Sequence, residues 1–80
     1  MTILVVVRTR DPHRQAEALR AALGLTLRGA RVEVAVAGPL LSPLAQRAAD
    51  TLRSFGHEVS SLGEDLSAAL ARADRVEIWT

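Results

Sequence analysis

The segment Arg8–Arg14 is the densest polar cluster in the sequence, with three arginines and a histidine against one aspartate. It follows an aliphatic run, and Asp11-Pro12 is typical of a helix start with Asp11 as the N-cap. A helix N-terminus offers free N–H groups and a partial positive charge, so an anion can bind there with help from Arg10. The commoner alternative is that Asp11 only caps the helix and the arginines are solvated. The predicted anion site contains Arg8, Thr9, Arg10, Asp11 and His13.

A second candidate loop, residues 37–42, contains a glycine and ends in another Ser-Pro helix start. Gly38 would let a ligand approach the backbone closely, and Ser42 is the expected N-cap of the helix that follows. Gly38 and Ser42 therefore join the predicted anion site. Leu40 and Leu41 are better explained by packing or a subunit contact than by chemistry, because apolar groups are enriched at the centres of interfaces.

The residue types present exclude several kinds of chemistry. The chain has no cysteine and all ten of its basic residues are arginine, which excludes disulfides, thiolate metal sites, persulfides, Schiff bases and a phosphate-loop lysine. His13 and His57 lack metal-ligand spacing, and the glycine motifs of dinucleotide-binding proteins and hydrolases do not occur. No carboxylate is marked as an acid or base. We expect no metal, no cofactor and no catalytic residue.

Length and composition indicate one soluble domain over residues 1–80, with 49% hydrophobic and 24% charged residues. A net charge of +1 and two aromatic residues make nucleic-acid binding an unlikely function. The longest apolar run, Ile3–Val7, is too short to cross a membrane, and the N-terminus lacks the features of a signal peptide. We expect a cytoplasmic protein.

The first half of the chain predicts strand, helix and strand. Ile3–Val7 has the continuous apolar character of a parallel strand covered on both faces. The helix that starts at Pro12 ends at Gly29, a left-handed stop, and residues 31–36 alternate with period two. This alternation predicts that the second strand is more exposed than the first. The expected apolar face of the helix is Ala16, Leu19, Ala22, Leu23 and Leu27.

The second half repeats the pattern. A helix from Pro43 to Gly56 carries an apolar stripe, residues 57–61 form a weak strand, a short helix follows, and residues 76–79 form a fourth strand. Ser61 is a candidate cap of the short helix, with Glu64 as its partner. The apolar positions of the two helices are Leu44, Ala48, Leu52 and Phe55, then Leu66, Ala69, Leu70 and Ala73.

The element order β-α-β-α-β-α-β predicts a three-layer α/β/α fold with a four-stranded parallel sheet and right-handed crossovers. The first strand is the most apolar and should lie in the interior. The strand order second-first-third-fourth fits this best, because the order fourth-third-second-first would require a neighbour to cover the first strand.

These elements resemble the DsrE/DsrF-like family of small α/β proteins, which includes sulfur-relay subunits and has a flavodoxin-like layered fold. The motifs that carry the resemblance are Ile3–Val7 leading into Asp11-Pro12, then Ala18–Leu23, Leu27–Val34, Phe55–Val59 and Arg72–Val76. Active members carry a sulfur-accepting cysteine after the third strand, where this chain has Ser60-Ser61-Leu62-Gly63. A serine hydroxyl cannot hold and pass on a sulfane sulfur.

The resemblance implies a non-catalytic module that binds a small anion or a partner subunit, in the context of sulfur metabolism. One alternative is a sulfur-carrier subunit whose thiol comes from a sulfur-relay partner, and another is a purely structural subunit. We also expect a homo-oligomer, because a small sheet has two edges to protect. Trp79 lies beside charged residues on the last strand and is the leading interface candidate, together with Leu40 and Leu41.

Overall fold

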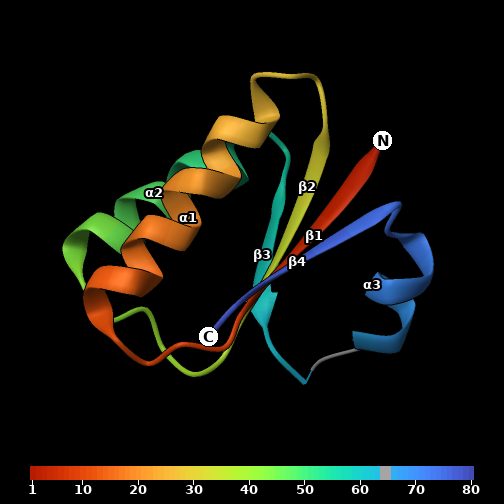
Figure 1. Cartoon of the computed structure of the whole chain (residues 1–80). Helices are drawn as coiled ribbons and strands as arrows, with labels where there is room; N and C mark the ends of the chain where they lie inside the picture. The colour runs from red at the N-terminus through yellow and green to blue at the C-terminus, as the bar shows by residue number, and fades with distance from the viewer. Residues whose placement is uncertain (64–65) are drawn as a thin grey trace.

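Four parallel strands form one sheet in the order β3-β2-β1-β4, with β1 and β2 in the interior (Figure 1). This computed structural model describes residues 1–63 and 66–80. The four-stranded parallel sheet and the interior position of the first strand are both confirmed. The strands are β1 (Thr2–Val7), β2 (Arg31–Val36), β3 (Glu58–Ser61) and β4 (Arg75–Trp79).

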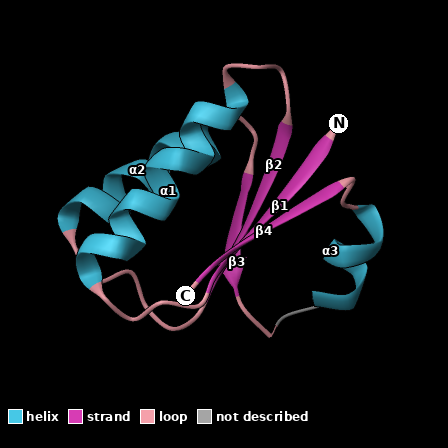
Figure 2. Cartoon of the chain, in the orientation of Figure 1, coloured by secondary structure: helices cyan, strands magenta, loops and turns pink. Residues whose placement is uncertain are grey.

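The helices lie on both faces of the sheet, as the sequence predicts. Figure 2 shows α1 (Pro12–Thr26) and α2 (Pro43–Ser54) together on one face and α3 (Leu66–Arg72) alone on the other. The chain steps from β1 to β2 to β3 across one face, then returns over the other face to place β4 beside β1. This arrangement is the one that crossovers of a single hand produce. It leaves β3 and β4 as the two edges.

Both strand orders considered from the sequence are wrong. The predicted order separates the second strand from the third, whereas β2 pairs with both β1 and β3. The error comes from the alternation in β2, which suggested a strand with one wet face. In the structure Glu33 and Ala35 on that face are buried, so β2 is an interior strand that is covered on both sides.

The helix boundaries follow the predicted signals. Asp11 and Ser42 cap α1 and α2, because their side chains accept hydrogen bonds from the N–H groups of His13 (2.9 Å) and Ala45 (3.1 Å). After each helix the chain passes through a glycine with positive φ, Gly29 at 82° and Gly56 at 84°, a conformation that costs glycine little. Caps and stops of this kind are local, which is why the sequence predicts them well.

The larger core lies between the sheet and the α1–α2 layer. Leu19 and Leu52 are fully buried there, against strand valines such as Val5 and Val34. Three predicted core positions are wrong, since the buried faces of the two helices are narrower than their apolar stripes and are built largely from alanine. The exposed residues are Leu27 (89%), Leu44 (57%) and Phe55 (70%).

The other face of the sheet is thinly covered. No residue of α3 is buried, and this helix shields a small cluster formed by Leu4, Val6 and Ala35. Ser61 is the last residue of β3 and stands well before α3 begins, so the prediction that it caps this helix is wrong. Its proposed partner, Glu64, lies outside the described residues. This face therefore has room for cavities beside α3 and along β4.

Candidate functional site

The predicted anion residues do not form one cluster. Asp11 and Ser42 are engaged as caps, and Nε2 of His13 lies 2.7 Å from a carboxylate oxygen of Glu17 on the same helix. Arg8 lies on the α3 side, where it lines an apolar groove with residues of β4. Asp11 therefore caps the helix, as predicted. A carboxylate at the N-cap also opposes anion binding there, because it already occupies the positive end of the helix.

Arg10 and Gly38, however, are brought together from the loops that follow β1 and β2. Gly38 has a φ of 76°, and a Cβ atom at this position would lie 3.0 Å from Cζ of Arg10. The guanidinium therefore rests directly on the Gly38 backbone, in a space that a side chain would fill. Thr9 helps to hold the loop that carries Arg10, because its hydroxyl oxygen accepts a hydrogen bond from the Asp11 N–H at 3.2 Å.

Gln15 holds the second loop in place, a role that the sequence analysis missed. Its side chain is fully buried on α1. The amide nitrogen donates to the Pro39 carbonyl at 3.0 Å, and the amide oxygen accepts from the Leu41 N–H at 2.8 Å. A polar side chain buried in this way must satisfy its hydrogen bonds, so Gln15 fixes the loop against α1.

A cavity of about 370 Å³ opens between this loop and the edge strand β3. It lies at the carboxyl ends of β2 and β3, the position where ligands bind in parallel α/β sheets, and its volume is sufficient for a small ligand. Arg53 of α2 is the charged residue among the described residues that line this cavity. The lining residues are Val36, Gly38, Pro39, Leu40, Arg53, Val59, Ser60 and Ser61.

Arg53 reaches along β3 into this cavity. Its Nη2 donates to the Val59 carbonyl at 3.0 Å, and its Nη1 lies 3.9 Å from a carboxylate oxygen of Asp50. A guanidinium has five N–H donors, so these two contacts leave donors for a ligand. Half of the Arg53 side chain is exposed. The structure thus places a positive charge and the Ser61 residue around one cavity.

Most of the predicted interface residues make contacts within the chain itself. Leu40 and Trp79 are partly buried and pack against the α1–α2 core, and the Arg14 guanidinium lies 5.2 Å from the centre of the Trp79 ring. Nε of Arg14 also donates to the Thr80 carbonyl at 2.7 Å. The Trp79 ring thus lies on the face of the sheet opposite α3.

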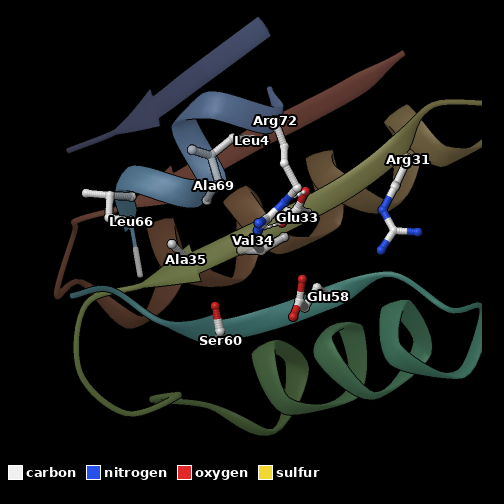
Figure 3. Close-up of a pocket in the computed structure, with 10 residues that line it drawn as sticks. All are labelled: Leu4, Arg31, Glu33, Val34, Ala35, Glu58, Ser60, Leu66, Ala69 and Arg72. Carbon is white, nitrogen blue, oxygen red and sulfur yellow. Dashed lines mark hydrogen bonds and ion pairs between the residues drawn. The ribbon is translucent and has the colours of Figure 1, made fainter. Parts of the chain in front are cut away.

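A polar cavity of about 420 Å³ lies beside α3, over β2 and β3 (Figure 3). An ion pair forms part of its wall. Arg72 donates two hydrogen bonds to Glu33, from Nη2 at 2.7 Å and from Nε at 3.2 Å. Glu58 stands opposite Glu33 on the neighbouring strand, and Arg31 lies at the end of the cavity. The charges of two carboxylates and two guanidiniums balance in this cavity, so it offers an anion no net positive charge.

Glu33 as a residue is only 4% exposed, yet its carboxyl is stabilised in the charged form. The hydrogen bond from Arg72 is the largest cause that holds the pKa of Glu33 below its ordinary value, and burial opposes this lowering. The positive charges of Arg72 and Arg31 lower the pKa further, as does a side-chain hydrogen bond with Glu58. Glu33 therefore serves to fasten α3 to the sheet and is a poor candidate for an acid at neutral pH.

Two further searches of the described residues bear on function. No three His, Asp or Glu side chains within 1–63 and 66–80 gather closely enough to hold a metal ion. Of the helices in this part of the chain, none combines the length and apolar character that crossing a bilayer requires. A scan against protein-family models, a search of curated proteins and a search of solved structures each found no match to this chain.

Proposed function

We propose that this protein is a non-catalytic DsrE-like module that binds a small oxyanion in the cavity between the Gly38 loop and β3. The observation that carries the proposal is Arg53, a guanidinium that lines a cavity at the carboxyl ends of two parallel strands. A planar guanidinium can donate hydrogen bonds to two oxygens of one sulfate, phosphate or carboxylate group. Arg10, which lies against Gly38, adds positive charge to the same loop.

The family resemblance supports the same location. It places the sulfur-accepting residue of active members in the loop after the third strand, and here Ser61 ends β3 at the wall of the cavity. A serine in this position can donate a hydrogen bond to an oxyanion but cannot form a persulfide. The sulfur-carrier alternative then requires a thiol from a sulfur-relay partner, and the chain itself would bind the oxidised sulfur species without reacting with it.

Thermal unfolding in sulfate or phosphate, against sodium chloride at equal ionic strength, tests the proposal. Ligand that binds the folded state alone stabilises it by mass action, by about 2.7 kcal/mol when its concentration is 100 times Kd. We expect a higher melting temperature in both oxyanions than in chloride. Arg53→Ala should remove most of this increment, and Arg10→Ala should reduce it.

Arg47→Ala provides the matched control, since Arg47 is an exposed arginine of the same helix outside this cavity. It should keep the full increment, which separates a site from general salt effects. For each variant, the melting temperature in oxyanion is compared with that of the same variant in chloride. Arg53→Ala also loses the hydrogen bond to the Val59 carbonyl, and this comparison removes the effect of any lower starting stability. An Arg53→Ala increment equal to that of Arg47→Ala would refute the anion site.

A further inference from the structure

The edge strand β4 exposes apolar side chains on the thinly covered face of the sheet. Val76 is 40% exposed and Ile78 62%, and Leu70 of α3 is 46% exposed. These three side chains border an apolar groove of about 410 Å³ that reaches in to Val6 and Leu66. Native proteins normally protect a sheet edge of this kind, because an exposed apolar edge pairs readily with another strand.

The backbone of β4 is also ready to pair. The Trp79 carbonyl accepts hydrogen bonds from the N–H groups of Arg8 (2.8 Å) and Thr9 (3.2 Å) and therefore points toward β1. Backbone polar groups of successive strand residues point to opposite sides. Val76 and Ile78 alternate with Trp79, so their N–H and C=O groups point away from β1, toward the open edge.

We propose that two copies of this chain associate through β4, antiparallel to β4 of the second copy, with the two Val76 residues opposite each other at the twofold axis. A twofold interface of this kind is self-complementary and closed, and it would join two four-stranded sheets into one continuous sheet. This interface lies at the opposite edge from β3 and its anion cavity, so it is independent of the proposed function.

The charges on β4 favour a second copy of this chain as the partner and favour pairing of the two strands with Val76 at the axis. With Val76 at the axis, Arg75 of each copy lies opposite Glu77 of the other. These are non-hydrogen-bonded pairs, with Cα atoms about 4.5 Å apart and side chains in contact. Within one chain Arg75 already forms an ion pair with Glu77 on the same face of β4, so the pairing assembles four alternating charges.

The neighbouring register is less favourable. A shift of β4 that centres the axis on Glu77 would place the two Glu77 carboxylates directly opposite each other, and like charges in this position are destabilising. It would also set Arg75 against Trp79 of the second copy, whose ring face already holds the Arg14 guanidinium. On the α3 face the Val76-centred register brings both Val76 side chains together and continues the two apolar grooves into each other.

Charge-reversal variants with sedimentation analysis test the proposal. The wild-type chain should show a mass twice that of one 8.6 kDa chain as concentration rises. Arg75→Glu alone and Glu77→Arg alone should each be monomeric, because each creates two like-charge contacts across the axis. An equimolar mixture of the two variants should recover the doubled mass, because each cross-axis contact in the mixed dimer again joins opposite charges. No arrangement within one chain can produce this recovery.

Two controls keep the result decisive. Circular dichroism should show that both variants remain folded, since Arg75 is half-exposed and Glu77 partly exposed on an edge strand. Ile78→Pro removes an N–H group that points outward, which an edge strand tolerates, and it should also yield monomers. A dimer that survives in Arg75→Glu or in Ile78→Pro, or a mixture that stays monomeric, would overturn the proposal.

Discussion

Removal of Arg72 tests how α3 is fastened to the sheet. Arg72 donates two hydrogen bonds to Glu33, which is 39 residues away in the sequence and almost fully buried. Arg72→Ala leaves the Glu33 carboxylate in a poorly solvated position without this partner. Breaking a buried ion pair by removal of one member costs about 3–5 kcal/mol.

The expected cost here is smaller, since the Arg72 side chain is 52% exposed and water can reach its former position. We therefore expect a loss of about 1–3 kcal/mol of unfolding free energy at neutral pH. In a domain of this length, that corresponds to a melting temperature lower by roughly 5–20 °C. Arg20→Ala, an exposed arginine of α1, is the control and should change stability by no more than about 0.5 kcal/mol.

The pH dependence of this loss provides the sharper test. The folded-state pKa of Glu33 is lowered, so its ion pair stabilises the wild type above the ordinary glutamate pKa. This contribution is lost as the pH falls through the folded-state pKa, where Glu33 becomes protonated. In Arg72→Ala the largest cause of the lowering is absent while burial remains, so the pKa of Glu33 should rise.

The difference in stability between wild type and Arg72→Ala should therefore shrink as the solution is acidified from neutral pH to below the pKa of Glu33. Urea unfolding monitored by circular dichroism across this range measures it. A difference that is constant with pH would show that Arg72 acts through packing of its aliphatic stem and would refute the electrostatic account. A loss no larger than that of Arg20→Ala would show that α3 does not depend on the pair.

The remaining predictions concern the loop that forms the anion cavity and one glycine of α1, and thermal unfolding measures each. Gln15→Leu leaves the Pro39 carbonyl and the Leu41 N–H without their buried partner and should cost about 1–3 kcal/mol. Gln46→Leu, at an exposed position of α2, should be nearly neutral, and equal effects of the two changes would contradict the role of Gln15 in holding the loop. Gly38→Ala forces a side chain into positive φ and against Arg10, at a cost of about 1–2 kcal/mol, and should also reduce the stabilisation by sulfate. Gly24→Ala, in a helix with open space around the added Cβ, should instead raise stability by about 0.5–1 kcal/mol, and a loss there would contradict the helix geometry.

The elements of this fold could be predicted because their signals are local. Asp11-Pro12 and Ser42-Pro43 start helices by capping chemistry that needs no tertiary contact, and the aliphatic run of β1 predicts an interior strand on its own. The strand order could not be predicted in the same way. The interior position of β2 requires Glu33 to be buried, and burial of this carboxylate requires a partner. The partner is Arg72, and no local sequence pattern reveals that Arg72 lies next to Glu33.

The candidate site shows the same limit. The sequence drew attention to Arg10 and Gly38, which lie against each other in the structure, because a polar loop and a glycine at strand ends are recognisable features. It missed Arg53, because an arginine at the end of an amphipathic helix looks like a solvated charge until β3 is placed beside it. Gln15 was missed for a related reason: nothing in a helical pattern distinguishes a buried glutamine from an exposed one.

The unequal covering of the two faces explains where binding can occur. The α1–α2 face buries nearly all of the apolar core, so stability is concentrated there, and the anion cavity lies at its rim, along the β3 edge. The α3 face is fastened by one short helix and an ion pair, and it leaves Val76 and Ile78 uncovered at the β4 edge. Since an anion at the first edge and a second copy at the other would touch no common residue, each can be removed by mutation without disturbing the other. Arg53→Ala should therefore still dimerise, and Arg75→Glu should still be stabilised by sulfate.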